Sequence, residues 1–129
     1  MKLIENFKNI EMEISKEKGA FSLFALVLRE DSQEKWDLLI SAPWLLNDQN
    51  EIPQKKSILF YFVDKISKID KSLLNELSRI ILLLPNDPFV TNMNSIVKAE
   101  HKMTEFRSCT FNNIYIKHAF IITSQKVNP

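Results

Sequence analysis

The sequence predicts an α/β fold in which a single domain, residues 1–129, is built on a mixed five-stranded sheet with helices packed on it. The length of 129 residues lies near the commonest size of a single domain. Apolar runs that are typical of strands alternate along the chain with segments of helical spacing. Only Gly19 is a glycine, so Asn, Asp and Pro must form the turns, and their clusters separate the elements. The expected order is helix, two strands, two helices, strand, helix and two strands, and helices between strands favour parallel crossovers.

The first helix is indicated by apolar residues that recur at steps of four and three along one stripe. The stripe consists of Leu3, Phe7, Ile10 and Ile14. Charged residues, Glu11 among them, stand between these positions, and the helix should end before Gly19. The segments 20–30 and 36–44 follow, separated by a charged turn at 30–35. Two strands joined by a polar loop indicate a hairpin.

The middle of the chain should cross over the sheet and return as a buried strand. Residues 54–68 keep helical spacing and are expected to cover one face. Asp70 is placed to cap a short further helix that runs through Leu77. The run 79–85, RIILLLP, shows no alternation, as is typical of a strand buried on both faces. We therefore expect this run to be the central strand.

The last third of the chain should form one more helix and a hairpin. Asp87 can cap the helix, with Pro88 at its first position, where a missing N–H has no cost. The inner stripe of this helix should consist of Phe89, Met93, Ile96 and Val97. Two closing strands flank a turn at Asn112 and Asn113.

Trp36 and Trp44 lie on one face of the second strand, which is apolar throughout. Eight residues of strand separate them by about 26 Å at roughly 3.3 Å per residue, so they cannot enclose one small ligand. Pro43 lacks a ladder donor and should end the strand, which turns Trp44 over the end of the core. Structural aromatics at both ends of the sheet are the favoured interpretation, and a pocket at Trp44 alone is the alternative.

The closing hairpin carries a charged group that needs an explanation. With a two-residue turn, Arg107 faces His118 and Glu105 faces Phe120. One face of the hairpin should then carry Met103, Cys109, Phe111, Ile114, Ile116, Phe120 and Ile122. Buried charges are costly unless they are paired. The group of Glu105, Arg107 and His118 is therefore either a structural ion pair or a site that holds a small anionic ligand.

Cys109 is predicted to lie on the same face as Arg107, where it could act as a nucleophile with His118 as its base. Such a pair needs a thiolate and an oriented base. Packing of Cys109 as a small buried hydrophobe is the favoured interpretation.

Asp87, Glu100 and Lys102 have the spacing that metal-dependent nucleases of the restriction-endonuclease type use to hold Mg²⁺ and to assist the attacking water. The pattern is short, and Asp87 is better explained as a helix cap, so no family resemblance follows from it. No other metal site is expected, because one cysteine and two histidines cannot form a Cys/His cluster.

The composition excludes several classes of function. A formal net charge of +1 gives no field that would hold nucleic acid or a membrane surface. A single glycine cannot supply a Walker A loop or a Rossmann fingerprint, so no cofactor is expected. The N-terminal segment lacks the apolar stretch of a secretory signal, and the apolar runs are too short to cross a bilayer. The chain is therefore expected to be soluble and cytoplasmic.

These observations favour a non-catalytic binding or protein-interaction module over an enzyme. Because the end strands of a sheet expose unpaired backbone groups, we also expect a homodimer formed through a sheet edge. The alternatives are a small metal-dependent hydrolase or nuclease, and a binder of an anionic ligand at Glu105, Arg107 and His118.

Overall fold

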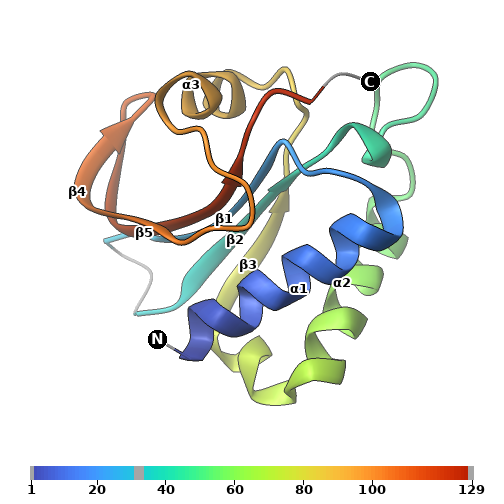
Figure 1. The fold of residues 1–129 in the computed structure, drawn as a ribbon, viewed down its shortest axis with the longest axis horizontal. Coiled ribbons are helices and arrows are strands. Elements are labelled where there is room, and N and C mark those ends of the chain that lie inside the picture. Colours follow the sequence, from blue (N-terminus) through green and yellow to red (C-terminus); the bar gives the residue numbers. More distant parts are fainter. Residues whose placement is uncertain (1, 31–33, 128–129) are drawn as a thin grey trace.

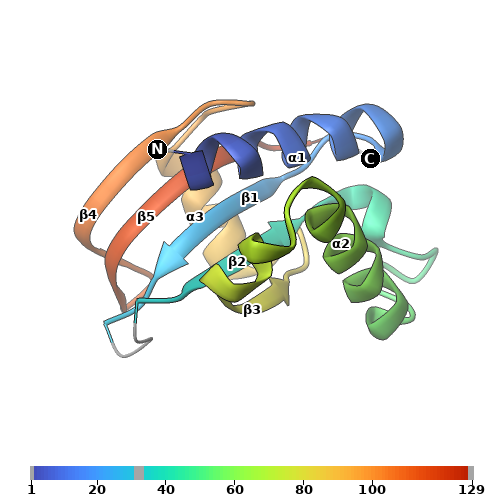
Figure 2. The same cartoon turned by 90° about the horizontal axis from the view of Figure 1, so that it is seen from below.

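A five-stranded mixed sheet forms the centre of the molecule, with the strand order β3-β2-β1-β5-β4 (Figure 1). The computed structural model describes residues 2–30 and 34–127. The strands are β1 (Leu23–Leu28), β2 (Trp36–Ser41), β3 (Leu77–Leu82), β4 (Thr104–Phe111) and β5 (Ile114–Ser124). The helices α1 (Lys2–Lys18) and α2 (Lys55–Ile69) cover one face of the sheet, and α3 (Pro88–Ile96) covers the other (Figure 2).

The order of elements confirms the predicted α/β fold. The short helix after Asp70 is a 3₁₀ helix, Lys71–Glu76, and the Asp70 side chain caps it by accepting a hydrogen bond from the backbone N–H of Ser72. A second 3₁₀ helix, Pro43–Leu45, follows β2, so the strand ends before Pro43 as predicted. Of the charged turn expected at 30–35, residues 31–33 lie outside the described residues.

The central strand is β1, and the prediction that 79–85 would be central is wrong. All six residues of β1 are buried, and β1 pairs antiparallel with both β2 and β5. The strand β3 lies at an edge, parallel to β2, because α2 makes the crossover between them. Ile80 faces the core on the side of α1 and α2, whereas Ile81 faces the side of α3. An edge strand with apolar contacts on both faces therefore produces the same unbroken apolar run as a central strand.

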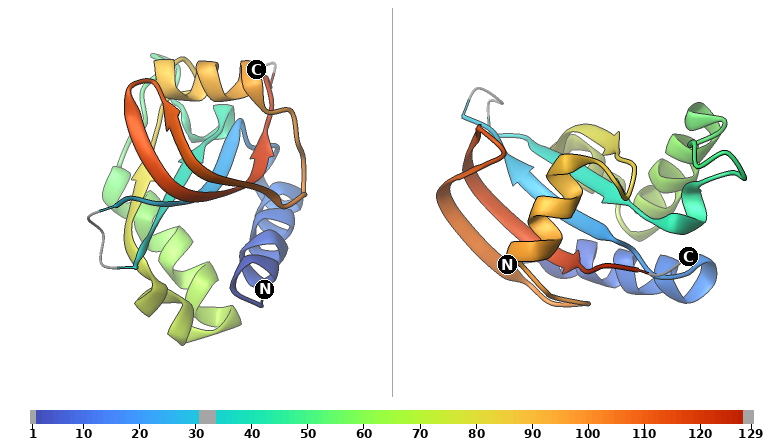
Figure 3. Two further views of the ribbon diagram at one scale, coloured as in Figure 1. Left: turned by 90° about the vertical axis from the view of Figure 1, so that its left-hand side faces the viewer. Right: turned by 90° about the horizontal axis from the view of Figure 1, so that it is seen from above.

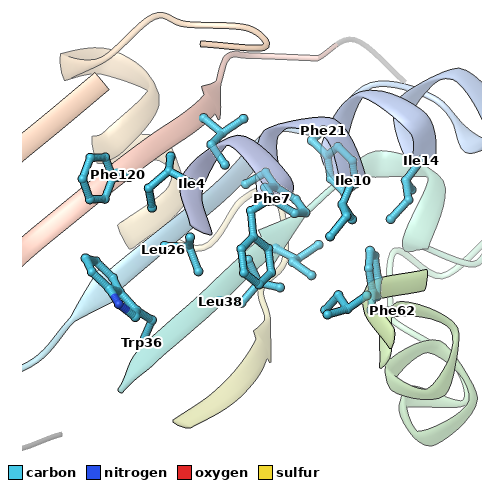
Figure 4. Close-up of a cluster of buried hydrophobic side chains, with 14 of the residues drawn as sticks. Ile4, Phe7, Ile10, Ile14, Phe21, Leu26, Trp36, Leu38, Phe62 and Phe120 are labelled. Carbon is cyan, nitrogen blue, oxygen red and sulfur yellow. The ribbon is translucent and has the colours of Figure 1, made fainter. Parts of the chain in front are cut away.

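The larger core lies between the sheet and the two helices α1 and α2 (Figure 4). Phe7 from α1, Leu26 from β1 and Phe62 from α2 are fully buried there. Trp36 closes one end of this core against Phe120, and Trp44 closes the other end against Phe21 and Phe62. The predicted placement of the two tryptophans at opposite ends of the core is confirmed.

The smaller core lies on the α3 side, where Asp87 caps α3 by accepting from the backbone N–H of Phe89. Val90, Met93 and Val97 are the buried residues of its inner stripe. Ile96 is 60% exposed, so its predicted place on that stripe is wrong. The helix has only nine residues, and rotating it to bury Val90 carries Ile96 to the solvent side.

The hairpin of β4 and β5 has the predicted register, with Arg107 opposite His118 and a turn in which Asn112 and Asn113 both have positive φ. The prediction of one continuous apolar face is wrong. Cys109, Phe111 and Ile116 pack in the α3-side core, whereas Phe120 and Ile122 pack in the core under α1. Ser108 has a φ of 48°, and at this point the hairpin turns over so that its tip curls toward α3 (Figure 3). Of the apolar side chains just named, those nearer the tip than Ser108 therefore face the α3-side core, and those on the other side of Ser108 face the core under α1, although the β4–β5 register is unchanged.

Candidate functional site

The three charged residues predicted as a group do come together at the outer edge of the hairpin. Glu105 Oε2 lies 2.6 Å from His118 Nε2 and 3.0 Å from Arg107 Nη2. The His118 ring also packs against Trp36 and Phe120, with ring centres 5.3 Å and 4.7 Å apart. The group is therefore an ion-paired carboxylate next to an imidazole that rests on the rim of the core.

The electrostatics of this group suit a structural role. The hydrogen bond from His118, assisted by the charge of Arg107, holds the pKa of Glu105 below its ordinary value. Arg107 itself is mostly exposed. The two cavities described below are lined by other residues, so the group contacts its own members and the aromatic rim.

The remaining predicted candidates do not assemble with one another. Asp87 follows β3, while Glu100 follows Ala99, which pairs with Ser124 at the end of β5. Three strand spacings along the sheet separate these places by about 14 Å, whereas Mg²⁺ needs ligands at about 2.1 Å. Asp87 therefore cannot share a metal ion with Glu100 and Lys102. Within residues 2–30 and 34–127, no three His, Cys, Asp or Glu side chains are grouped as metal ligands.

Cys109 and His118 lie on opposite faces of the sheet, because the hairpin turns over at Ser108. Burial raises the pKa of the Cys109 thiol, which disfavours the nucleophilic thiolate. A Cys109–His118 dyad is therefore ruled out by geometry.

Trp44 lines an open cavity of about 480 Å³ together with Lys18, Ile58 and Tyr61, at the end of α1 and α2. Its indole N–H is buried without a hydrogen-bond partner in the structure. Trp44 also packs on Phe21 and Phe62, so the same side chain closes one end of the core and lines this cavity.

A group of charged and apolar side chains lies on the other face of the sheet, in a cavity of about 300 Å³ that we call the sheet cavity. Its floor is formed by β1, β2 and β3, and its walls by the start of α3 and the tip of the hairpin. The apolar side chains that line it are Val27, Leu39, Ile81, Leu83, Phe89, Ile114 and Ile116. The polar ones are Arg29, Asp37, Arg79, Asp87 and Asn112.

A buried carboxylate holds two arginines at one end of the sheet cavity. The side chain of Asp37 is only 3% exposed, and its Oδ2 accepts a hydrogen bond of 2.6 Å from Arg29 Nε. Arg79 approaches from the edge strand, with Nε 3.2 Å from Oδ1 and Nη2 3.3 Å from Oδ2. The β2–β3 register pairs Asp37 directly with Arg79, which explains why the two side chains meet.

The hairpin tip is fastened over the sheet cavity by a contact with α3. Asn92 Nδ2 donates a hydrogen bond of 2.7 Å to Asn112 Oδ1. Because Asn112 and Ile114 line the cavity, this bond fixes one of its walls.

A second buried acid, Glu11, was expected on the polar side of the first helix, and that expectation is wrong. Glu11 is fully buried, and it lies 2.5 Å from His101 Nδ1 and accepts a 2.8 Å hydrogen bond from Thr123 Oγ1. Burial raises the pKa of Glu11 although both hydrogen bonds act against it. These contacts join α1 to β5 and to the segment that precedes β4.

The sequence contains a signal for the burial of each of these two acids. Glu11 continues the spacing of Ile4, Phe7 and Ile14, so it stands within the apolar stripe of the helix. Asp37 is a lone acid in an apolar strand. An acid at a buried position requires a partner, but the partners, His101 and Arg79, are distant in the sequence.

Comparisons with known proteins give no further guide, because no family model, no curated protein and no solved structure matches the chain. Across the part of the chain that the structure describes, none of the helices has the length and apolarity needed to span a bilayer.

Changing Glu105 to Gln tests the charged group at the hairpin edge. A carboxylate with a lowered pKa contributes stability that is complete above its ordinary value of 4.5 and is lost as the pH falls below that value. Urea unfolding should show wild type more stable than Glu105→Gln above pH 4.5, with the difference shrinking on acidification. A difference that stays constant with pH would contradict the ion-pair interpretation.

Changing Glu11 to Ala tests the buried acid. The hydroxyl of Thr123, which is itself buried, would lose its acceptor, and we expect a loss of about 1–3 kcal/mol in the free energy of unfolding. Glu13→Ala on the exposed side of the same helix is the matched control and should cost about 0.5 kcal/mol or less. Equal effects of the two changes would show that the Glu11 contacts add nothing.

Proposed function

We propose that the chain is a non-catalytic binding module and that its ligand is a small molecule held in the sheet cavity. The observation that carries this proposal is the cavity itself, which combines seven apolar side chains with an ion-paired group of Arg29, Asp37 and Arg79. Small-molecule sites are typically concave, mostly apolar and equipped with a few placed polar groups. A volume of about 300 Å³ lies at the lower limit of such sites.

The lining favours binding over catalysis. Asp37 is engaged by two arginines, and Asp87 caps α3. Among the described residues that line the cavity there is no Ser, Thr, Cys, His, Lys or Tyr. Side chains of these types serve as nucleophiles and proton carriers in most enzymes.

Binding of 1-octanol, a neutral apolar probe, tests the proposed site. We expect a Kd on the order of 1 mM, as is usual for a ligand of this size. In ¹⁵N-correlated NMR spectra, the shifts should cluster at Val27, Leu39 and Ile116.

A variant in which a larger side chain fills the cavity is the control for the octanol experiment. Ile81→Trp places a larger side chain in the cavity and should abolish binding. Ile80→Trp, its neighbour on the opposite face of β3, should retain it. Octanol that does not shift these resonances, or that binds equally to Ile81→Trp, would refute the proposal.

A homodimer, expected from the sequence, would have its contact at β3. The other edge, β4, is interrupted by Glu105, Arg107 and the positive φ of Ser108, which are features that protect an edge from pairing. From Ile80 to Leu84, by contrast, the chain at the β3 edge carries only half-buried aliphatic side chains.

Light scattering at micromolar concentration tests this association. We expect a mass near twice the 15.1 kDa of one chain. Leu84→Lys, in the same half-buried aliphatic stretch but in neither of the two cores, should return the mass to that of one chain, whereas Ile114→Lys at the hairpin tip should not. A wild-type mass of one chain would show that the prediction is wrong.

A further inference from the structure

We propose that the sheet cavity selects ligands that carry an anionic head group on an apolar body, and that Arg79 is the residue that binds the head group. This inference rests on the proposed function and names the class of ligand that the cavity would take. It follows from the orientation of one guanidinium and from the distribution of charge along the cavity.

Arg79 is held in place yet keeps donors to offer. It engages Asp37 through Nε and Nη2, so a buried carboxylate occupies one side of the planar guanidinium. The outer edge, formed by Nη1 and Nη2, presents parallel N–H donors of the kind that bind a carboxylate through both oxygens. The side chain is 54% exposed, so a ligand can reach this edge without displacing another side chain.

Asp37 acts as the positioning residue for Arg79. Its own charge is buried and paired, and it reduces the freedom of a long side chain that would otherwise lose entropy on binding. Arg29, which directly follows β1, binds the same carboxylate and is less exposed than Arg79, at 28%. The exposed cation at this end of the cavity is therefore Arg79.

The rest of the cavity fits an apolar tail. Arg79 and Leu83 are four residues apart along the edge of the sheet, which corresponds to about 13 Å. Ile81 lies between them on the cavity side. Asp87 lies beyond Leu83, at the start of α3, so the acidic group is far from the cation, and an anion at Arg79 would not meet its repulsion.

Three probes with the same eight-carbon tail test the proposal: octanoate, 1-octanol and octylamine. We expect octanoate to bind wild type about tenfold more tightly than 1-octanol, as a charge-assisted hydrogen bond allows, and octylamine to bind more weakly than 1-octanol. Raising the salt concentration should reduce the preference for octanoate.

Substitutions test whether the preference for octanoate over 1-octanol depends on Arg79. Arg79→Gln should lower the affinity for octanoate to that for 1-octanol, and Arg79→Lys should keep part of the preference. Arg107→Gln removes the same charge from the hairpin edge, outside the cavity, and should leave all three affinities unchanged. Thermal melts check that each variant is folded, and the comparison of probes on wild type needs no variant.

The outcomes separate this inference from the proposed function. If 1-octanol binds in the cavity but octanoate binds no more tightly, the head-group inference is wrong and the binding module stands. If octanoate keeps its preference in a folded Arg79→Gln variant, Arg79 is not the anchor. If none of the three probes binds, both proposals fall.

Discussion

The complete burial of β1 is the constraint on which the rest of the structure depends. All six of its residues are buried, so both faces of the sheet must be covered. The helices α1 and α2 cover one face with a continuous core. On the other face a nine-residue helix is too short to cover the sheet, and the hairpin curls over to complete the cover (Figure 3). The sheet cavity is the space between these two partial covers.

Among the residues that the structure describes, two acids, Glu11 and Asp37, are buried, and each one links elements that are distant in the sequence. Burying a carboxylate costs several kcal/mol unless partners compensate for the lost hydration. Asp37 meets arginines from β3 and from the end of β1, whereas Glu11 meets His101 and Thr123. The Glu11 contacts end in the imidazole of His101, which lines neither of the two cavities. Those of Asp37 end in a guanidinium at the surface, which is why the Asp37 site, and not the Glu11 site, supports a proposal of ligand binding.

The candidate sites differ in what surrounds them as well as in their chemistry. Glu105 pairs with both Arg107 and His118, and the His118 ring packs on Phe120 at the rim of the larger core. Arg79 lines an apolar space, and its guanidinium is held by Asp37 but remains 54% exposed. Small-molecule sites typically combine an apolar lining with a few placed polar groups, and the sheet cavity has both.

By itself the sequence determined the class of fold, the order of its elements and the register of the closing hairpin. These features depend on local patterns: the helical stripes, the caps at Asp70 and Asp87, and the Asn112–Asn113 turn. It also brought Glu105, Arg107 and His118 together correctly, because cross-strand neighbours follow from a known turn. Only the tertiary structure decided that β3 is an edge strand, that Glu11 is buried, that the hairpin changes faces at Ser108 and that Arg79 meets Asp37. Each of these depends on which strands become neighbours and how far the sheet coils, and such contacts join residues whose spacing along the chain carries no periodic signal.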